Sequence, residues 1–168
     1  MLKASAKGKF YAQGLNFSCK RCSACCRFEA GYVFLSRKDA SLLCAALSMD
    51  YDSFLKTYCR WVPEKSGSQQ LSLKEKSNYD CVFWNSRQSD GSLVNQGCFV
   101  NEGCFVYEAR PLQCRTFPFW PSIMRSKGSW KMTAEDCPGM NQGALHSEDS
   151  IREMLSMRQA EPIISKNV

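Results

Sequence analysis

The sequence predicts a small α+β fold, a single domain of short helices and a small antiparallel sheet or hairpins organised around a cysteine-rich metal centre. Three observations support this prediction. The chain has 168 residues, enough to bury about 70% of the surface of the unfolded chain around one ordinary core. Its helical and strand-like hydrophobic patterns are all short. It also contains eleven cysteines, more than packing alone requires.

Up to residue 70 the pattern indicates two helices between irregular segments. Ser36 and Asp50 each stand directly before an amphipathic stretch, where a side-chain oxygen can cap the first turn of a helix. In the second stretch Phe54, Leu55 and Tyr58 repeat at helical spacing. The expected elements are a tight loop at 19–26, a short strand at 31–36, a helix at 37–48 with Leu42, Leu43, Ala46 and Leu47 on its apolar face, a helix at 51–60 and a loop at 63–70.

Beyond residue 70 the pattern becomes strand-like and then helical again. The segment SDGS at 89–92 supplies a turn signal between two strands. Pro111 suits the first turn of a short helix, because its missing N–H has no partner there in any case. The expected elements are strands at 71–76, 79–84 and 97–108, a short helix from Pro111 that carries Cys114 and Arg115, a hairpin turn at 126–130, a helix at 148–159 with Ile151, Met154, Leu155 and Arg158 on one face, and a loose tail.

The composition divides the chain into three parts. Residues 1–16 form a basic N-terminal arm, residues 17–143 contain the cysteine motifs and form the expected metal-binding domain, and residues 144–168 form the C-terminal helix and a loose tail. The N-terminus lacks the continuous apolar stretch of a signal peptide, and no stretch reaches the roughly 18 apolar residues of a membrane span. We therefore expect a cytoplasmic protein without membrane contact.

Eleven cysteines in the reducing cytosol favour metal or redox chemistry over a disulfide framework. The odd count agrees, since the cysteines cannot all pair within one chain. The formal charge of +6 counts every thiol as neutral. Eight thiolates add eight negative charges, of which two divalent ions or two [4Fe–4S]²⁺ clusters cancel four, and the total then falls to +2. The basic residues that could neutralise such a centre, or simply form a solvated surface, are Lys20, Arg21, Arg27, Arg110 and Arg115.

The segment SCKRCSACCRF, residues 18–28, carries the densest group of cysteines. Two overlapping Cys-x₂-Cys steps join Cys19, Cys22 and Cys25, and such a step brings both sulfurs within reach of one metal ion, at about 2.3 Å for zinc. Cys26 follows immediately. Because neighbouring side chains diverge, we expect Cys25 and Cys26 to serve different ions or different faces of a polynuclear centre. A redox disulfide and buried structural thiols are the alternatives.

Iron–sulfur and redox signatures match this segment only in part. The first three cysteines match the opening of a bacterial ferredoxin run, but Glu29 stands where its fourth cysteine would be. The Cys-x₃-Cys-x₂-Cys spacing of radical SAM enzymes is absent, and a thioredoxin-like site needs a βαβ pattern that this region lacks. An iron–sulfur centre therefore stays open without a known signature.

Four further cysteines have distinctive settings, in DCVFW (Cys81), CFVYEARPLQCRTFPF (Cys104 and Cys114) and EDCPG (Cys137). With these, the order and spacing over residues 17–143 resemble the YkgJ-like cysteine-cluster family, described as a zinc- or iron-chelating domain. Its pattern is Cys-x₂-Cys-x₂-Cys-Cys, a lone cysteine, Cys-x₂-Tyr-x₂-Arg-Pro-x₂-Cys-Arg-x₂-Pro-Phe and Cys-Pro-Gly. The last two motifs are filled by Cys104, Tyr107, Arg110, Pro111, Cys114, Arg115, Pro118 and Phe119, and by Cys137, Pro138 and Gly139.

The resemblance implies eight metal ligands, which suit two Cys₄ ions or one larger thiolate cluster. It implies Zn²⁺, with iron or an iron–sulfur cluster as the alternative. GCFV occurs twice, and we align the copy with Cys104 because only that copy is followed by Tyr107 and Arg110; Cys98 stays an open candidate. Members of the family often have glycine at or near the position of Ser23. The expected ligands are Cys19, Cys22, Cys25, Cys26, Cys81, Cys104, Cys114 and Cys137.

Other side chains near the motifs have expected supporting roles. Arg110 and Arg115 could donate hydrogen bonds to the sulfurs and steady thiolate charge, or act as surface or capping residues. Cys44 and Cys59, on predicted helices, are expected to be small buried hydrophobes. His146, the single histidine, is expected to be exposed. The aromatic residues expected to shield the metal are Phe117, Phe119 and Trp120.

Three functions are compatible with these motifs. We predict a metal-binding protein whose metal organises the fold, with metal ions, and optionally a protein, as partners. The second is a protein-modifying enzyme of a methyltransferase-like kind, since the cysteine pattern also resembles part of the flagellin lysine N-methylase family; with one histidine and no nucleotide-binding motif, catalysis would occur at the metal. The third, a nucleic-acid-binding zinc module, is disfavoured because the basic residues are scattered.

Overall fold

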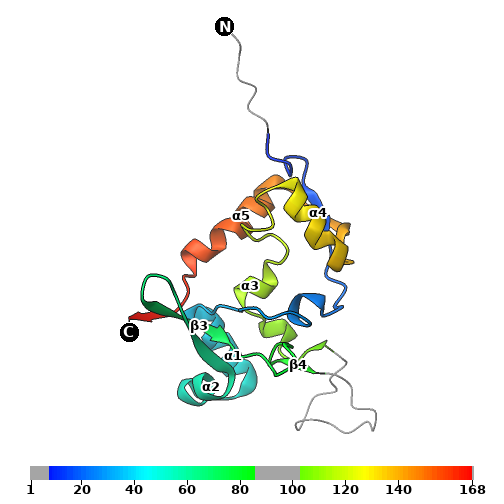
Figure 1. Cartoon of the computed structure of the whole chain (residues 1–168). Coiled ribbons are helices and arrows are strands. Elements are labelled where there is room, and N and C mark those ends of the chain that lie inside the picture. Colours follow the sequence, from blue (N-terminus) through cyan, green and yellow to red (C-terminus); the bar gives the residue numbers. More distant parts are fainter. Residues whose placement is uncertain (1–7, 86–102, 168) are drawn as a thin grey trace, which may run out of the picture. The chain divides into compact units, whose positions relative to one another are not determined.

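The computed structural model describes residues 8–85 and 103–167 (Figure 1). The chain forms two compact units. The larger unit comprises Arg21–Phe117 and Met157–Val168, and the smaller unit comprises Met1–Lys20 and Pro118–Ser156. Each unit combines short helical segments with small antiparallel sheets, and the predicted α+β class is confirmed. The predicted division at 16/17 and 143/144 stays a prediction.

The larger unit contains one three-stranded antiparallel sheet in the order β2-β3-β7 and a two-stranded antiparallel sheet of β4 and β5. In chain order its described elements are the 3₁₀ turn η1 (Ala24–Cys26), α1 (Arg37–Leu47), α2 (Tyr51–Tyr58), β2 (Cys59–Pro63), β3 (Ser68–Leu73), β4 (Trp84–Asn85), β5 (Gly103–Cys104), the 3₁₀ turn η2 (Tyr107–Ala109), α3 (Leu112–Arg115) and β7 (Ser165–Asn167).

Both predicted helix caps of the larger unit are confirmed. The Ser36 side chain accepts a hydrogen bond from the Asp39 amide, and the Asp39 carboxylate accepts one from the Ser36 amide, which completes a capping box for α1. The Asp50 carboxylate accepts a hydrogen bond from the Ser53 amide at the start of α2. The apolar face of α1 was predicted wrongly in part, because Leu42 is exposed while the carboxylate of Asp39 is buried.

The sheet of the larger unit overturns two predictions. The second helix was predicted to reach residue 60, but α2 ends at Tyr58 and Cys59 begins β2, opposite Leu73. The C-terminal tail was predicted to be loose, but β7 pairs with β3 from Ser68↔Asn167 to Gln70↔Ser165. β3 is joined to β2 by the short loop 64–67, whereas β7 lies far from β3 in the sequence. In both cases pairing with β3 supplies hydrogen bonds that local propensity does not indicate.

The other predicted strands are shorter than expected. Residues 31–36 form only isolated bridges, Phe34↔Ser72 and Ser36↔Ile163, and residues 79–83 turn before β4. Of the predicted strand at 97–108, residues 97–102 lie outside the described residues, and β5 is followed by a turn and η2. The buried residues of the core of this unit are Leu35, Ala40, Leu43, Phe54, Cys59, Leu71, Leu73, Phe83 and Val106.

The smaller unit contains an antiparallel pair of strands and α4, and most of α5 belongs to it. Its described elements are β1 (Leu15–Phe17), α4 (Lys127–Asp136), β6 (Met140–His146) and α5 (Glu148–Ala160), whose last four residues belong to the larger unit. α5 confirms the helix predicted at 148–159. The hairpin turn predicted at 126–130 is wrong, because Ser126 caps α4 by accepting a hydrogen bond from the Ser129 amide.

His146 packs inside an aromatic group of the smaller unit rather than standing exposed as predicted. Its Nε2 lies 3.1 Å from the carbonyl oxygen of Phe17, and its ring centroid lies 4.9 Å from that of Phe119. Trp130, which is 3% exposed, stacks on Phe119 at 5.9 Å. Phe17 of β1 and His146 of β6 therefore both contact Phe119 in this group.

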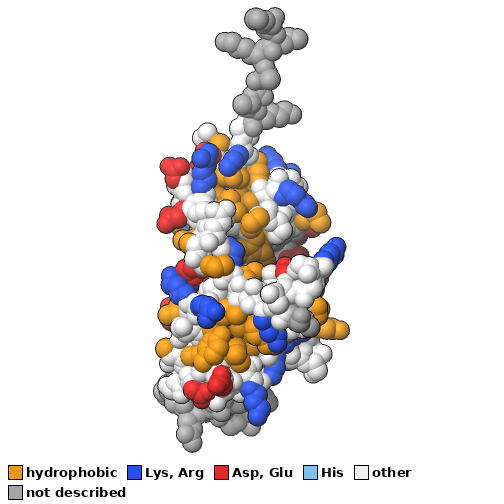
Figure 2. Space-filling model, turned by 90° about the vertical axis from the view of Figure 1, so that its left-hand side faces the viewer, with side chains coloured by type: hydrophobic (Ala, Val, Ile, Leu, Met, Phe, Trp, Pro, Cys, Tyr) orange, Lys and Arg blue, Asp and Glu red, His pale blue; other side chains and the backbone are white. Residues whose placement is uncertain are grey.

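Figure 2 shows one face of the molecule, on which hydrophobic side chains reach the surface between polar ones and Lys and Arg side chains are scattered. None of the helices in residues 8–85 and 103–167 is long and apolar enough to cross a membrane. Among the described residues, the large hydrophobic side chains that are exposed are Phe28, Tyr32, Leu42, Tyr51 and Tyr79 in the larger unit and Met132 and Leu145 in the smaller one.

Candidate metal centre

The loop that carries Cys22, Cys25 and Cys26 is held in the predicted tight turn by its own backbone. The amide and the thiol of Cys26 both donate hydrogen bonds to the carbonyl oxygen of Ser23, at 3.0 and 3.2 Å. Arg21 and Ser23 adopt left-handed backbone conformations, with φ of 53° and 65°. This conformation costs roughly 1–2 kcal/mol for a residue with a Cβ, so surrounding contacts must hold the loop.

Cys81 lies directly beside this loop. Its amide donates a hydrogen bond to the carbonyl oxygen of Cys26, with 2.8 Å between nitrogen and oxygen. Cys104 lies on β5 opposite Trp84. Trp84 lies on β4, three residues after Cys81 in the chain. Backbone hydrogen bonds therefore fix three of the predicted ligands, which come from three separate segments.

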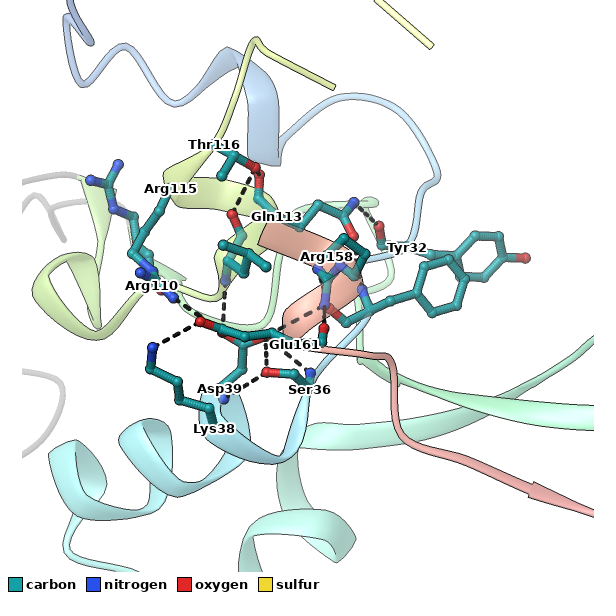
Figure 3. A network of polar contacts seen from close by, with 12 residues as sticks. Tyr32, Ser36, Lys38, Asp39, Arg110, Gln113, Arg115, Thr116, Arg158 and Glu161 are labelled. Carbon is teal, nitrogen blue, oxygen red and sulfur yellow. Dashed lines mark hydrogen bonds and ion pairs between the residues drawn. The ribbon is translucent and has the colours of Figure 1, made fainter. Parts of the chain in front are cut away.

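Cys114 lies on α3, and a buried carboxylate holds the start of this helix (Figure 3). Asp39 is 0% exposed. Its Oδ1 accepts a hydrogen bond from the Leu112 amide at 2.7 Å, and its Oδ2 accepts one from the Ser36 hydroxyl at 2.9 Å. A charged acceptor makes these hydrogen bonds stronger than neutral ones. Asp39 thus joins the first turn of α1 to the helix that carries Cys114.

Two arginines approach the Asp39 carboxylate (Figure 3). A terminal nitrogen of Arg115 lies 3.6 Å from Oδ1, and one of Arg158 lies 3.8 Å from Oδ2. Arg115 also lies 3.9 Å from the Glu161 carboxylate and donates from Nε to the Arg110 carbonyl oxygen at 2.9 Å. Arg115, for which contact with the sulfurs and a surface or capping role were both open, therefore has acidic partners that position α3.

Five free thiols of the larger unit interact electrostatically with one another: Cys25, Cys26, Cys81, Cys104 and Cys114. A hydrogen bond between the side chains of the adjacent Cys25 and Cys26 lowers the pKa of Cys25 to about 7. The same bond, followed by burial, raises the pKa of Cys26 far above its ordinary value. Cys25 is therefore the member of this pair that loses its proton first.

Burial keeps the other three thiols protonated. It raises the pKa of Cys81 to about 11 and that of Cys104 above its ordinary value, and it raises the pKa of Cys114 well above that value. Negative charge on neighbouring cysteines adds to each of these shifts. A second thiolate in this group is therefore unfavourable until a cation neutralises it.

Arg110 brings positive charge to the same group. Its guanidinium stacks on the Tyr107 ring at 3.5 Å from the centroid, and its Nε donates a hydrogen bond to the Tyr107 carbonyl oxygen at 2.8 Å. Beyond the larger effects given above, its charge lowers the pKa of Cys25, Cys104 and Cys114. Stabilisation of the thiolates by Arg110, which the sequence suggested, is compatible with this geometry.

The smaller unit brings together the segments of the two other predicted ligands, Cys19 and Cys137. The amide of Ser18 donates a hydrogen bond to the carbonyl oxygen of Gly139 at 3.1 Å, and its hydroxyl accepts one from the Ala144 amide at 2.9 Å. A Cβ on Gly139 would lie 2.4 Å from the Ser18 carbonyl oxygen. The glycine of the Cys-Pro-Gly motif is thus required by the close approach of two backbones.

Two of the described cysteines, Cys44 and Cys59, stand outside these groups. Cys44 on α1 packs against the core of the larger unit, and Cys59 is one of its buried residues, 6% exposed. Burial raises the pKa of Cys59 to about 12. The expected role of both as core residues is compatible with this packing, although Cys59 lies on a strand rather than a helix. Cys98 lies outside the described residues.

The donor set fits a thiophilic metal. Thiolate sulfur is the ligand that zinc and iron–sulfur centres favour in proteins, and the group of five thiols includes no carboxylate. In the side-chain arrangement of residues 8–85 and 103–167, no three Cys, His, Asp or Glu side chains meet the geometry of a metal site. The fit therefore rests on donor chemistry and on the interaction of the five thiols.

Two acidic residues beside the ligands were missed by sequence analysis. The role of Asp39 could not be read from the sequence, because its partner, the Leu112 amide, lies 73 residues away. Asp80 directly precedes Cys81, is 2% exposed and accepts a hydrogen bond from Arg27 Nε at 3.1 Å. The one available signal was their position, Asp39 in a capping box after Ser36 and Asp80 next to a predicted ligand.

Comparison with known proteins agrees with the motifs. A family model described as "CxxCxxCC: Putative zinc- or iron-chelating domain" matches residues 18–138. This range contains all eight predicted ligands and both acidic residues named above. No solved structure matches the chain.

Proposed function

Because the chain belongs to the CxxCxxCC family of zinc- or iron-chelating domains, we propose that it binds zinc or iron through cysteine thiolates and that the metal organises its fold. The observation that carries this proposal is the group of five interacting thiols in the larger unit. These thiols come from four segments that backbone hydrogen bonds and the Asp39 carboxylate hold in place. Packing alone does not explain such a group, in which four of the five thiols are half-buried and the charge of neighbouring cysteines raises the pKa of each of these four.

The ligands we propose in the larger unit are Cys22, Cys25, Cys26, Cys81, Cys104 and Cys114. In the smaller unit we propose Cys19 and Cys137, whose segments the Ser18–Gly139 hydrogen bond joins. Eight ligands suit two tetrathiolate ions or one polynuclear centre. Zn²⁺ is the proposed metal, with iron or an iron–sulfur cluster as the alternative. Arg110 stabilises the thiolate charge, and Arg115 holds α3 through Asp39.

A bound metal supplies folding free energy by linking segments that are distant in sequence. The residues of the chain prepare for it in two ways. Asp39 and the Cys81–Cys26 backbone contact fix the segments, and Arg110 offsets part of the negative charge. Cys26, Cys81, Cys104 and Cys114 are spread over residues 26–114 of the sequence. A single ion or cluster bound to them would therefore link segments from most of the larger unit.

The proposal is tested by elemental analysis and absorption spectroscopy of the full chain purified without oxygen. A colourless protein with about two zinc ions per chain supports the zinc assignment. A brown protein with acid-labile sulfide supports the iron–sulfur alternative and gives the enzymatic alternative its required metal. Protein that contains no metal after growth with both metals, and takes up none of either after reduction, overturns the proposal.

A further inference from the structure

A buried ion pair joins the two loops that carry Cys26 and Cys81. Arg27 Nε donates a hydrogen bond to Asp80 Oδ1 at 3.1 Å, and the Asp80 side chain is 2% exposed. The second oxygen, Oδ2, accepts a hydrogen bond from the Asn78 side chain at 2.8 Å. Arg27 follows Cys26 and Asp80 precedes Cys81, so the ion pair lies one residue outside each of two proposed ligands.

The backbones of the same two loops are joined as well. The Cys81 amide donates to the Cys26 carbonyl oxygen at 2.8 Å, and within the second loop the Asp80 carbonyl oxygen accepts from the Lys76 amide at 2.8 Å. The ion pair and the backbone bond therefore act in parallel on adjacent residues. Together they restrict both the separation and the rotation of the two segments that present the sulfurs.

Arg27 is itself held by an aromatic side chain. Its guanidinium carbon lies 3.5 Å from the centroid of the Trp84 ring, and Trp84 is 6% exposed. Trp84 pairs with Cys104 across β4 and β5. The planar guanidinium can stack on a ring and pair with a carboxylate at the same time, which a lysine cannot do. Arg27 thus connects the loops of Cys26 and Cys81 to the strand of Cys104.

The backbone next to the ion pair adopts a costly conformation on both sides. Phe28 has φ of 76° and Tyr79 has φ of 67°, values that aromatic residues rarely adopt. Both side chains are more than half exposed, so their own packing does little to offset this cost. Residues in such conformations persist where surrounding contacts hold them, and the Arg27–Asp80 pair is the side-chain contact, beside the Cys81–Cys26 backbone bond, that joins both loops.

We propose that Arg27 and Asp80 are positioning residues of the metal centre, which hold Cys26, Cys81 and Cys104 in register before metal enters. This inference rests on the proposed function, because it assigns a role to residues around the same cysteines. It implies that the pair determines how tightly metal binds, beyond any contribution to the stability of the fold. Residues that orient metal ligands typically change affinity by about 10- to 100-fold when they are replaced.

The test compares variants of the full chain by competition for Zn²⁺ against a chromophoric chelator under reducing conditions. Asp80→Asn keeps the shape of the side chain and removes its charge, and Arg27→Gln removes the positive charge. We expect each to weaken zinc binding about 10- to 100-fold. Arg27→Lys keeps the positive charge but loses the planar guanidinium that stacks on Trp84. We expect its loss of zinc affinity to lie between that of the wild-type chain and that of Arg27→Gln.

The double variant Arg27→Gln/Asp80→Asn separates positioning by the pair from independent effects. If the two residues act as one contact, the double variant binds zinc about as weakly as either single variant rather than with the product of both losses. Leu43→Ala is the matched control. Leu43 is 0% exposed in the core of the same unit, so its truncation destabilises the fold without touching the ion pair.

The unfolding midpoint of each metal-free variant is measured in urea beside its zinc affinity. A loss of affinity in Asp80→Asn or Arg27→Gln that exceeds the loss in Leu43→Ala at equal destabilisation supports the inference. Equal losses, or unchanged affinity in Arg27→Gln, overturn it while leaving the proposed function intact. A wild-type chain that binds neither zinc nor iron overturns both. If Asp80→Asn does not fold, the zinc affinities of Arg27→Lys and Arg27→Gln are compared instead, since the Arg27 side chain is partly exposed and its replacement is better tolerated. A smaller loss of affinity in Arg27→Lys than in Arg27→Gln supports the inference, and unchanged affinity in both overturns it.

Discussion

The amide nitrogen of Ser18 lies 3.1 Å from the carbonyl oxygen of Gly139, so the residue before Cys19 is bonded to the residue two positions after Cys137. This contact needs a position without a Cβ, because an added carbon on Gly139 would lie 2.4 Å from the Ser18 carbonyl oxygen. The close approach of the two backbones explains why the Cys-Pro-Gly motif has glycine at this position, since a larger residue would not fit.

We therefore expect Gly139→Ala to destabilise the protein by about 1–3 kcal/mol, the usual cost of forcing atoms into a packed site. Gly128→Ala is the matched control in the same unit. Gly128 lies within α4, and its added Cβ would meet the Ser126 hydroxyl at an ordinary 3.6 Å. In a helix this exchange stabilises by about 0.5–1 kcal/mol. The urea concentration at the unfolding midpoint should therefore fall in Gly139→Ala and rise in Gly128→Ala. A shift in the same direction in both variants would contradict the packing argument.

The division of cysteines into ligands and core residues predicts different effects of replacement. Cys22→Ser and Cys104→Ser should lower metal content and stability, because each removes a proposed thiolate. Cys44→Ala should leave metal content unchanged, since Cys44 packs against the hydrophobic core. Elemental analysis of the three purified variants checks this. Equal metal loss in all three would show that the division is wrong.

Replacement of Asp39 should be among the most destabilising changes in the larger unit. Asp39→Ala removes the partner of the Leu112 amide and of Arg115 and Arg158. We expect a loss of about 3 kcal/mol, at the lower end for a broken buried ion pair because both arginines are partly exposed. Urea unfolding measures it.

A surface pair provides the control for Asp39. Glu148→Ala breaks an exposed i,i+4 pair with Arg152 and should cost no more than about 0.5 kcal/mol. A similar small loss for both variants would mean that Asp39 does not hold α3.

Ser23 adopts a left-handed conformation in the cysteine loop, with φ of 65°. Ser23→Gly should therefore leave metal content unchanged and alter stability by less than about 0.5 kcal/mol, since relief of strain offsets the greater freedom of the unfolded chain. Ser23→Val should lose about 1–2 kcal/mol, because a β-branched side chain tolerates this conformation least. Thermal unfolding of both variants distinguishes them, and a loss in Gly as large as in Val would contradict the expectation.

Thiol reactivity follows from the pKa values of Cys25 and Cys59, about 7 and about 12. A thiol reacts as its thiolate, so at pH 8 most Cys25 is reactive in metal-free reduced protein, against on the order of one Cys59 in 10⁴. We expect iodoacetamide to label Cys25 at least about 100-fold faster, as followed by peptide mass spectrometry. As the pH rises above 8 the rate at Cys25 should level off, while that at Cys59 keeps rising about tenfold per pH unit. Parallel pH profiles would contradict this.

Local features of the fold could be predicted from the sequence. The caps at Ser36 and Asp50 were found because a capping side chain bonds to an amide three residues away, so the signal and its partner share one window. α4 was missed because Gly128 and two serines suggested a turn, whereas burial of Trp130 and the Ser126 cap stabilise a helix. β2 was missed because its partner β3 supplies the stabilising bonds.

The candidate site divides in the same way. The cysteines were identifiable because a metal requires particular residue types at short spacings, and these remain visible in one dimension. The residues that hold the cysteines were not identifiable, because Asp80 and Arg27 are 53 positions apart and carry no motif. A buried charge is indicated only by its surroundings, which the fold creates.

The pairing of β7 with β3 has a consequence for synthesis in the cell. Ile164 donates a backbone hydrogen bond to Leu35 and accepts one from Leu71, and Arg158 reaches the Asp39 carboxylate. The unit with the densest cysteines therefore stays unfinished until its final segment has left the ribosome. During translation its thiols emerge long before the strand that completes their scaffold, so the sheet beside the cysteines is completed only after every cysteine of the unit has been made.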